Sequence, residues 1–288
     1  KRAESFLITS WLTGWKISTK RCSMNSVPVL MYHHVAPDRE ITPQGFKNQL
    51  QWLSENGYHC LSSSEFLAHL TGAKPANERS VVITFDDGYA DNWVYAFPSL
   101  KKFNFRAIIF VVTKFIQPEG KLRPTCEEGG KISDTQSAER ASEGFLNWTE
   151  IMAMAASGLV EFGSHTHTHR QFDERRAYLN MNEELARSKK EIERRLGQWC
   201  GAIAWPWGQF SQDWVGLLLE SGYRLAFTTR VGPNMPKSDP FLIRRFKVSR
   251  EDTASLARRL WLYRRPFSAI YSHFYNLDRR IKAAVTGR

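Results

Sequence analysis

Residues 81–88 read Val-Val-Ile-Thr-Phe-Asp-Asp-Gly, and the organisation of the chain can be read outward from them. The run 81–85 is apolar or β-branched, which is typical of a strand buried in a parallel sheet. Asp86 and Asp87 follow it directly. Buried carboxylates are costly unless something compensates them, so this strand end predicts a functional site. The alternative is a pair of carboxylates that caps the next helix.

Strands and helices alternate on both sides of this run. The predicted strands are 28–32, 81–85, 107–112, 159–162, 202–205, 225–229 and 241–243. The predicted helices are 43–57, 91–103, 148–157 and 180–196. Such alternation predicts an α/β fold with a parallel sheet, either open or closed into a barrel.

Histidines follow other predicted strands at the same edge of the sheet, where the active sites of such folds lie. His165-Thr-His-Thr-His169 comes after strand 159–162. An extended segment would point all three imidazoles to one side, whereas a helical turn would bring His165 and His169 together and send His167 elsewhere. Two imidazoles with a carboxylate form a common metal-binding set with positions open for water.

A further histidine pair follows strand 28–32. His33 suits a general acid, because the pKa of imidazole lies near neutrality. His34 is expected to be a packing or surface residue. His273 competes with His33 for the acid role, but it lies in the basic C-terminal segment, beyond the last predicted strand.

Three motifs now resemble a known family. Thr84-Phe-Asp-Asp-Gly88 and Ser164-His-Thr-His-Thr-His169 resemble the first two motifs of the polysaccharide deacetylases, carbohydrate esterase family 4 with its NodB-homology domain. Val29-Leu-Met-Tyr-His-His-Val35 resembles the branch whose catalytic His precedes the Asp pair, as in poly-N-acetylglucosamine deacetylases. The resemblance covers about residues 27–248. It implies a distorted (β/α)7 TIM-like barrel over residues 27–250.

The resemblance also implies a reaction and roles for the matching residues. Asp86 would be the general base, and His33 would protonate the leaving amine. The backbone N–H of Tyr89 would help to hold the oxyanion. The ligands of one divalent metal, zinc before Co, Ni, Mn or Fe, would be Asp87, His165 and His169. The implied partner is an N-acetylated glycan.

Later motifs depart from the family pattern. The segment Ala204-Trp-Pro-Trp-Gly208 has Ala where the family commonly has an Arg that orients the catalytic Asp. Pro206 and Trp207 remain as candidates for a wall of the substrate groove. The family's late Asp-Trp and Leu-x-His segments have only poor counterparts, in Asp213-Trp214 and Tyr271-Ser-His273.

The net charge of +11 is concentrated at the C-terminus. Residues 244–288 hold 12 Lys and Arg against 3 Asp and Glu, whereas the preceding residues hold 28 against 26. A nucleic-acid-binding domain would be expected to spread its basic face more widely, so no nucleic-acid partner is expected. Residues 251–288 form a basic aromatic tail. Its helix, with Leu256, Leu260, Trp261 and Tyr263 on an apolar face, would pack on the barrel, lie on an anionic membrane surface or bind another polyanion.

Two other segments fall outside the regular pattern. Residues 1–26 are predicted as an N-terminal extension, of which residues 1–23 either precede a translation start at Met24 or serve as a short anchor. A start at Met24 predicts a cytoplasmic protein, peripheral at the inner membrane face, whereas an anchor predicts a periplasmic or extracellular one. Residues 117–144 are polar and aperiodic, which predicts a long insertion. Four scattered cysteines exclude a zinc ribbon or a disulfide scaffold.

The expected function is therefore metal-dependent removal of N-acetyl groups from an amino-sugar polysaccharide or glycan precursor of the bacterial cell surface. Within the enzyme class, the alternative is a metallo-amidohydrolase or O-acetyl esterase that acts on a small molecule. From another class, the alternative is a catalytically inactive glycan-binding barrel. The presence of Asp86 argues against an inactive barrel.

Overall fold

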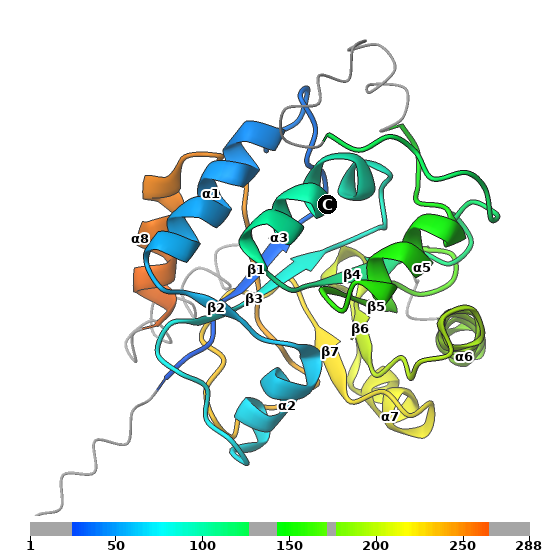
Figure 1. The fold of residues 1–288 in the computed structure, drawn as a ribbon. Helices are drawn as coiled ribbons and strands as arrows, with labels where there is room; N and C mark the ends of the chain where they lie inside the picture. Colours follow the sequence, from blue (N-terminus) through cyan, green and yellow to red (C-terminus); the bar gives the residue numbers. More distant parts are fainter. Residues whose placement is uncertain (1–24, 127–142, 172–176, 265–288) are drawn as a thin grey trace, which may run out of the picture.

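The computed structural model describes residues 25–126, 143–171 and 177–264, and it contains a parallel sheet surrounded by helices (Figure 1). The strand order is β7-β6-β5-β4-β3-β1-β8, with β2 paired to β3 outside this order. The strands are β1 (Val29–Tyr32), β2 (His59–Cys60), β3 (Ser80–Phe85), β4 (Ala107–Val111), β5 (Val160–Ser164), β6 (Ala202–Ala204), β7 (Leu225–Phe227) and β8 (Phe246–Lys247). Every pairing between these strands is parallel, which confirms the predicted α/β class.

The segment before β8 joins the two ends of the sheet. Ile243 forms an isolated bridge with Phe227 of β7, and Phe246 pairs with Leu30 of β1. The sheet therefore curves into a partly closed barrel. Residues 228–245, all of them described, contain no helix between β7 and β8, so the fold departs here from a regular (β/α)7 repeat.

The predicted strand at 241–243 is wrong. The strand that follows β7 is β8, which begins at Phe246, and Ile243 forms only an isolated bridge. The side chain of Asn234 gives the reason, because its amide oxygen accepts the N–H of Arg244 at 2.9 Å and its amide nitrogen donates to the carbonyl of Arg244 at 2.9 Å. These two bonds tie residue 244 back to residue 234 of the same β7–β8 connection, so the chain leaves β7 and crosses to β1.

The helices cover the outside of the sheet and one end of it. They are α1 (Pro43–Glu55), α2 (Ser63–Thr71), a π-helix (Asn92–Ala96) that continues as α3 (Phe97–Phe103), α5 (Trp148–Ala156), α6 (Ala177–Leu196), α7 (Gln212–Glu220) and α8 (Thr253–Tyr263). The four predicted helices are confirmed, with ends shifted by a few residues. Helices α2 and α7 are not among the predicted helices, although Ser62 and Glu65 form a capping box at the start of α2.

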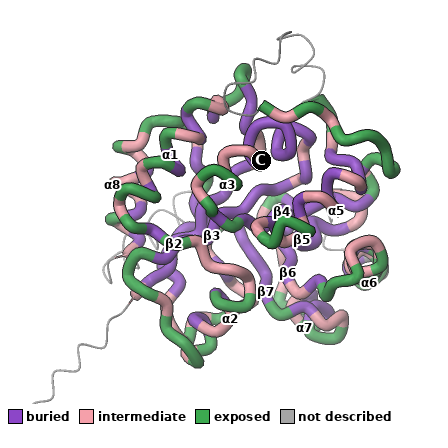
Figure 2. The backbone as a smooth tube through the Cα atoms, in the orientation of Figure 1, coloured by how far each residue is buried: buried purple, intermediate pink, exposed green. Residues whose placement is uncertain are grey.

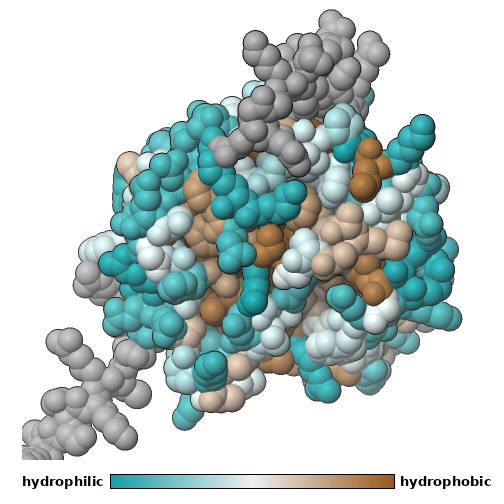
Figure 3. Space-filling model, in the orientation of Figure 1, coloured by the Kyte–Doolittle hydropathy of each residue, from teal (hydrophilic) through white to brown (hydrophobic). Residues whose placement is uncertain are grey.

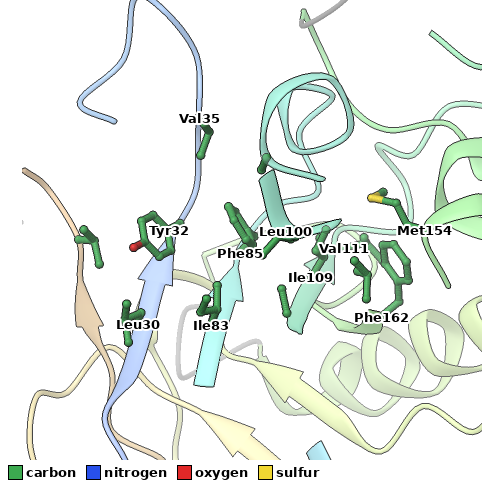
Figure 4. Packing of buried hydrophobic residues seen from close by; sticks show 14 of the residues in the cluster. Leu30, Tyr32, Val35, Ile83, Phe85, Leu100, Ile109, Val111, Met154 and Phe162 are labelled. Carbon is green, nitrogen blue, oxygen red and sulfur yellow. The ribbon is translucent and has the colours of Figure 1, made fainter. Parts of the chain in front are cut away.

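The hydrophobic core has two layers, because alternate residues of each strand face opposite sides of the sheet. The outer layer lies between the sheet and the helices and includes Leu30, Tyr32, Ile83, Phe85, Ile109, Val111 and Phe162 (Figure 4). The inner layer includes Val29, Val82, Ile108, Phe110 and Phe227, with Phe66 and Leu70 of α2. Helix α2 thus packs against the inner layer, and the carboxyl ends of the strands remain for the site.

The tube coloured by burial shows buried strands and helices with exposed outer faces (Figure 2). On the surface of the same face, hydrophilic residues predominate, and hydrophobic ones reach the surface near its centre (Figure 3). Among the described residues, the exposed large hydrophobic side chains are Leu122, Trp199, Trp207, Leu219 and Trp261.

The first helix of the predicted tail packs on the domain. Helix α8 lies beside α1 (Figure 1), and Leu256, Leu260 and Tyr263 are buried in the same core as the outer layer of the sheet. Only Trp261 of the predicted apolar face is exposed, at 53%. The apolar side of this helix, which could have faced a membrane, is therefore mostly buried inside the protein. For residues 253–263, the prediction that the helix packs on the barrel is the correct one.

Parts of three predicted segments lie outside the described residues: 1–24, 127–142 and 265–288, the last with His273. Membrane contact through the rest of the tail and the domain boundary at residue 250 stay predictions. No helix in the described part of the chain has the length and apolar character needed to cross a membrane.

Candidate metal centre and active site

The predicted site residues lie where strands end. His33 follows β1, Asp86 and Asp87 follow β3, and His165 follows β5. Six described residues other than glycine adopt a left-handed backbone, and four of them lie at this edge. These four are Asp87, Thr166, His169 and Trp207, with φ of 73°, 63°, 56° and 60°. Such conformations cost about 1–3 kcal/mol each and concentrate at functional sites.

The side chains of Asp87, His165 and His169 form a cluster that can hold a metal ion. Their ligand atoms all lie within 4.8 Å of one another. Nε2 of His165 is 3.4 Å and Nε2 of His169 is 3.3 Å from the same Oδ1 of Asp87. Two imidazole nitrogens and one carboxylate oxygen therefore converge on one point, and this donor set fits zinc and its first-row neighbours.

The segment between the two histidines is neither extended nor helical. It is a tight turn, with left-handed residues at Thr166 and His169. The N–H of His169 donates to Oγ1 of Thr166 at 3.2 Å. The imidazole of His167 does not join the cluster, since its Nδ1 lies 2.8 Å from Oγ1 of Thr113. The turn therefore brings the first and third histidines together, as a helical turn would have done.

A backbone carbonyl sets the tautomer of His165. Its Nδ1 lies 2.8 Å from the carbonyl oxygen of Ala204. A carbonyl only accepts, so Nδ1 carries a hydrogen and Nε2 is the atom that faces Asp87. Burial lowers the pKa of His165, but the hydrogen bond to Asp87 and the nearby aspartate charges raise it above the ordinary value. Burial likewise raises the pKa of Asp87, while His165 holds it below its usual range. Metal binding at this point would release the proton that the pair shares.

Arg245 compensates the charge of Asp86, although it is not among the site residues predicted from the sequence. Its Nη1 lies 2.7 Å from Oδ1 and its Nη2 lies 2.8 Å from Oδ2, and both side chains are buried. Its Nε donates to the carbonyl of Thr228 at 3.0 Å. Burial raises the pKa of Asp86, but the guanidinium of Arg245 holds it below its usual range. In the family pattern, an Arg two residues before the Pro orients the catalytic Asp, and this chain has Ala204 at that position. Arg245 thus provides that positive charge from another part of the chain.

His33 lies within electrostatic range of both aspartates. Burial lowers the pKa of His33, and the charges of Asp86 and Asp87 act against that effect. Its Nδ1 is buried and has no hydrogen-bond partner among the described residues. Its backbone carbonyl accepts from the amide of Asn92 at 2.9 Å. The structure therefore places His33 with the aspartate pair, as predicted.

His34 turns toward Asp91 and Tyr89. Its Nδ1 lies 2.5 Å from Oδ2 of the buried Asp91, and its ring stacks on that of Tyr89 with centroids 3.7 Å apart. Burial and a hydrogen bond to Asp87 raise the pKa of the Tyr89 phenol. The side chain of Tyr89 therefore lies against a candidate metal ligand, in addition to the predicted role of its backbone N–H.

Pro206 and Trp207 follow β6 in a short 3-10 turn, Pro206–Gly208. Pro206 is buried, whereas Trp207 is 59% exposed. The ring of Trp207 lies 5.4 Å, centroid to centroid, from that of His169. A Cβ at Gly208 would lie 2.0 Å from Oγ1 of Thr229, so this turn requires glycine. An exposed aromatic ring is therefore held beside the candidate metal ligands.

The sequence and the fold of this chain are similar to those of known proteins. Residues 73–226 match the family model named polysaccharide deacetylase. A poly-beta-1,6-N-acetyl-D-glucosamine N-deacetylase of Staphylococcus epidermidis is 26% identical over 227 residues, which cover 76% of this chain and 71% of that protein. The Escherichia coli K12 protein of the same name is 30% identical over 148 residues, 49% of this chain and 21% of that protein. The structure of IcaB from Ammonifex degensii superposes with a TM-score of 0.67 at 25% identity, over 82% of this chain and 97% of that chain.

The family match spans more than half of the chain and contains both the Asp86-Asp87 pair and the His165–His169 turn. IcaB has the same parallel, partly closed barrel. The chain therefore belongs to the polysaccharide deacetylase family, and it is a hydrolase that acts on carbon–nitrogen bonds.

Proposed function

We propose that this protein removes N-acetyl groups from a polysaccharide of the poly-β-1,6-N-acetylglucosamine type, in a reaction that needs one divalent metal ion. One observation carries the proposal: the Asp87, His165 and His169 cluster lies beside the buried Asp86–Arg245 pair. The names of the Staphylococcus and Escherichia relatives support the substrate class. Zinc is the first candidate, because two imidazoles and a carboxylate suit it; Co, Ni, Mn and Fe follow.

Deacetylation breaks the amide bond of an acetamido group. The oxygen of water bonds to the acetyl carbon, the C–N bond breaks, acetate leaves, and the sugar nitrogen gains a proton. When bound, the metal supplies Lewis acidity, which polarises the carbonyl and makes water more acidic. Asp86 accepts the proton of that water. Arg245 keeps Asp86 ionised, and each carboxylate oxygen that accepts from Arg245 retains a lone pair.

His33 delivers the proton to the leaving nitrogen. Its lowered pKa favours release of a proton once it carries one, and the charges of Asp86 and Asp87 favour its uptake. The backbone N–H of Tyr89 donates to the oxygen that gains charge in the transition state. Trp207 forms a wall on which a sugar ring rests, since an exposed aromatic face suits the apolar side of a pyranose. Pro206, the other predicted wall residue, is buried and cannot contact the sugar.

Acetate release from β-1,6-linked N-acetylglucosamine oligomers tests the proposal. The metal-loaded protein should release acetate. Asp86→Asn should lose about 10²–10⁴-fold in rate while it keeps its metal. His33→Ala should lose activity as well, whereas His59→Ala, at an exposed histidine of β2 that pairs with the start of β3 far from Asp86, serves as a control that keeps it. No acetate release by the metal-loaded wild type from any N-acetylhexosamine oligomer would contradict the proposed function.

A further inference from the structure

The turn between the two candidate histidine ligands rests on the carboxylate of Glu184, a half-buried residue of α6. The backbone N–H groups of His167 and Thr168 donate to Oε2 of Glu184 at 2.9 and 2.8 Å. The hydroxyl of Thr168 donates to Oε1 at 2.8 Å. One side chain therefore satisfies three donors of this turn.

The turn needs such an acceptor because its backbone is strained. Thr166 and His169 are left-handed at φ 63° and 56°, and successive N–H groups in turns of this kind form a concave site for an anion. Hydrogen bonds to a charged acceptor are stronger than neutral ones. Without Glu184, His167 and Thr168 would lose their acceptor, and the turn could relax to a less strained backbone. The left-handed backbone of His169, which directs its imidazole to Asp87, would then lose its support.

Helix α6 provides a rigid base for this contact. Ser188, one helical turn after Glu184, is buried and lies 2.7 Å, oxygen to oxygen, from Ser164 at the end of β5. Ser164 in turn accepts the N–H of Thr166 at 3.0 Å. Leu185 of the same helix is buried in the core. Two polar residues of α6, spaced i and i+4, therefore hold both ends of the segment that leads from β5 to the metal cluster.

We propose that Glu184 is a positioning residue for the metal centre. Through the backbone of His167 and Thr168, its carboxylate fixes the turn that presents His165 and His169 to one ion. The inference rests on the proposed metal site, and Glu184 itself touches neither metal nor substrate. Metal affinity should therefore depend on the reach of the acceptor at position 184 more than on its charge.

Two conservative variants separate reach from charge. In Glu184→Gln, the amide oxygen can accept both N–H groups and the amide nitrogen can donate to the Thr168 hydroxyl, so the contacts survive without the charge. Glu184→Asp keeps the charge, but its side chain is one methylene shorter and draws the acceptor away. Glu184→Ala removes both features. Glu183→Ala is the matched control, because Glu183 is the preceding, exposed residue of the same helix.

The experiment measures zinc affinity of the metal-free protein by competition with a chromophoric chelator. Glu184→Ala should bind zinc about 10–100-fold more weakly than wild type, and Glu184→Asp should also weaken. Glu184→Gln, which keeps the contacts and loses only the charge, should weaken zinc binding less than Glu184→Asp does, and Glu183→Ala should stay close to wild type. Thermal unfolding of the metal-free proteins is recorded in parallel, since a merely structural role would lower stability there without a change in the affinity of the folded protein.

Each outcome bears on a different claim. Equal zinc affinity in wild type and folded Glu184→Ala would overturn the positioning role and leave the metal site intact. If Glu184→Ala does not fold, the comparison uses the two conservative variants. Equal zinc affinities of Glu184→Asp and Glu184→Gln would then overturn the positioning role. An equal loss in Glu183→Ala would also overturn it. No zinc binding by the wild type would instead overturn the proposed metal site itself.

Discussion

Replacing Arg245 with Met tests how the protein tolerates a buried carboxylate at Asp86. The two side chains are 0% and 3% exposed and joined by bonds of 2.7 and 2.8 Å. Met keeps an unbranched apolar stem but removes the guanidinium, whose central carbon lies 5.7 and 5.9 Å from the ring centroids of Phe110 and Phe227. Loss of one partner from a buried ion pair costs about 3–5 kcal/mol. For a chain of this size, that corresponds to a fall in Tm of roughly 6–20 °C.

The loss should depend on pH in a defined direction. In wild type, Arg245 holds the native pKa of Asp86 below its unfolded value of about 3.9. The resulting stability is complete above the unfolded pKa and is lost as pH falls through the native one. In Arg245→Met, burial without the counter-charge raises the native pKa, so the penalty is largest at neutral pH and disappears once Asp86 is protonated. The difference between wild type and variant should therefore shrink toward acid.

Urea denaturation of wild type, Arg245→Met and Arg244→Met at pH 7 and pH 5 measures this difference. Arg244 is a matched control, because its guanidinium donates to a backbone carbonyl, that of Pro233 at 3.2 Å, and not to a buried carboxylate. Its replacement should cost about 1 kcal/mol. A loss below about 1 kcal/mol in Arg245→Met, equal at both pH values, would refute the view that Arg245 compensates Asp86.

Two further predictions concern other elements. Trp207→Ala should raise KM for glycan oligomers more than it lowers kcat, and Trp207→Gly should be more stable than Trp207→Ala by roughly 1 kcal/mol because residue 207 has a φ of 60°; equal urea midpoints would contradict the strain at this turn. Leu260→Ala should lower the free energy of unfolding by about 2–5 kcal/mol, whereas Trp261→Ala should lower it by less, because the Trp261 side chain is 53% exposed. The reverse order in urea denaturation would show that α8 does not pack as described.

Much of the site could be predicted because its signals are local. The apolar run 81–85 with its two terminal carboxylates, and the histidines after strand 159–162, each combine a strand pattern with chemistry at its carboxyl end. A parallel sheet brings such ends to one edge. The strand pattern therefore predicted a carboxylate and two histidines at one edge, the resemblance to the deacetylases implied that these are Asp87, His165 and His169, and the structure does bring the three together.

The contacts that the sequence could not reveal are long-range. Arg245 lies 159 residues from Asp86, and it stands beside Arg244 in a basic segment where no local feature marks one arginine as buried. The strand next to Arg245 was predicted at 241–243, whereas β8 begins at residue 246, because the side chain of Asn234 hydrogen-bonds to the backbone of residue 244 and redirects the chain there. Helix α8 shows the same limit, since an amphipathic pattern is the same whether its apolar face meets a protein or a membrane.

Metal content per chain tests the central claim most directly. The protein is reconstituted with zinc, freed of excess ion and analysed for bound metal, together with Asp87→Ala and His165→Ala. The account predicts one zinc ion per wild-type chain, lost in both variants while acetate release disappears with it. A folded wild type that binds no Zn, Co, Ni, Mn or Fe, or variants that keep their metal, would contradict the assignment of the cluster.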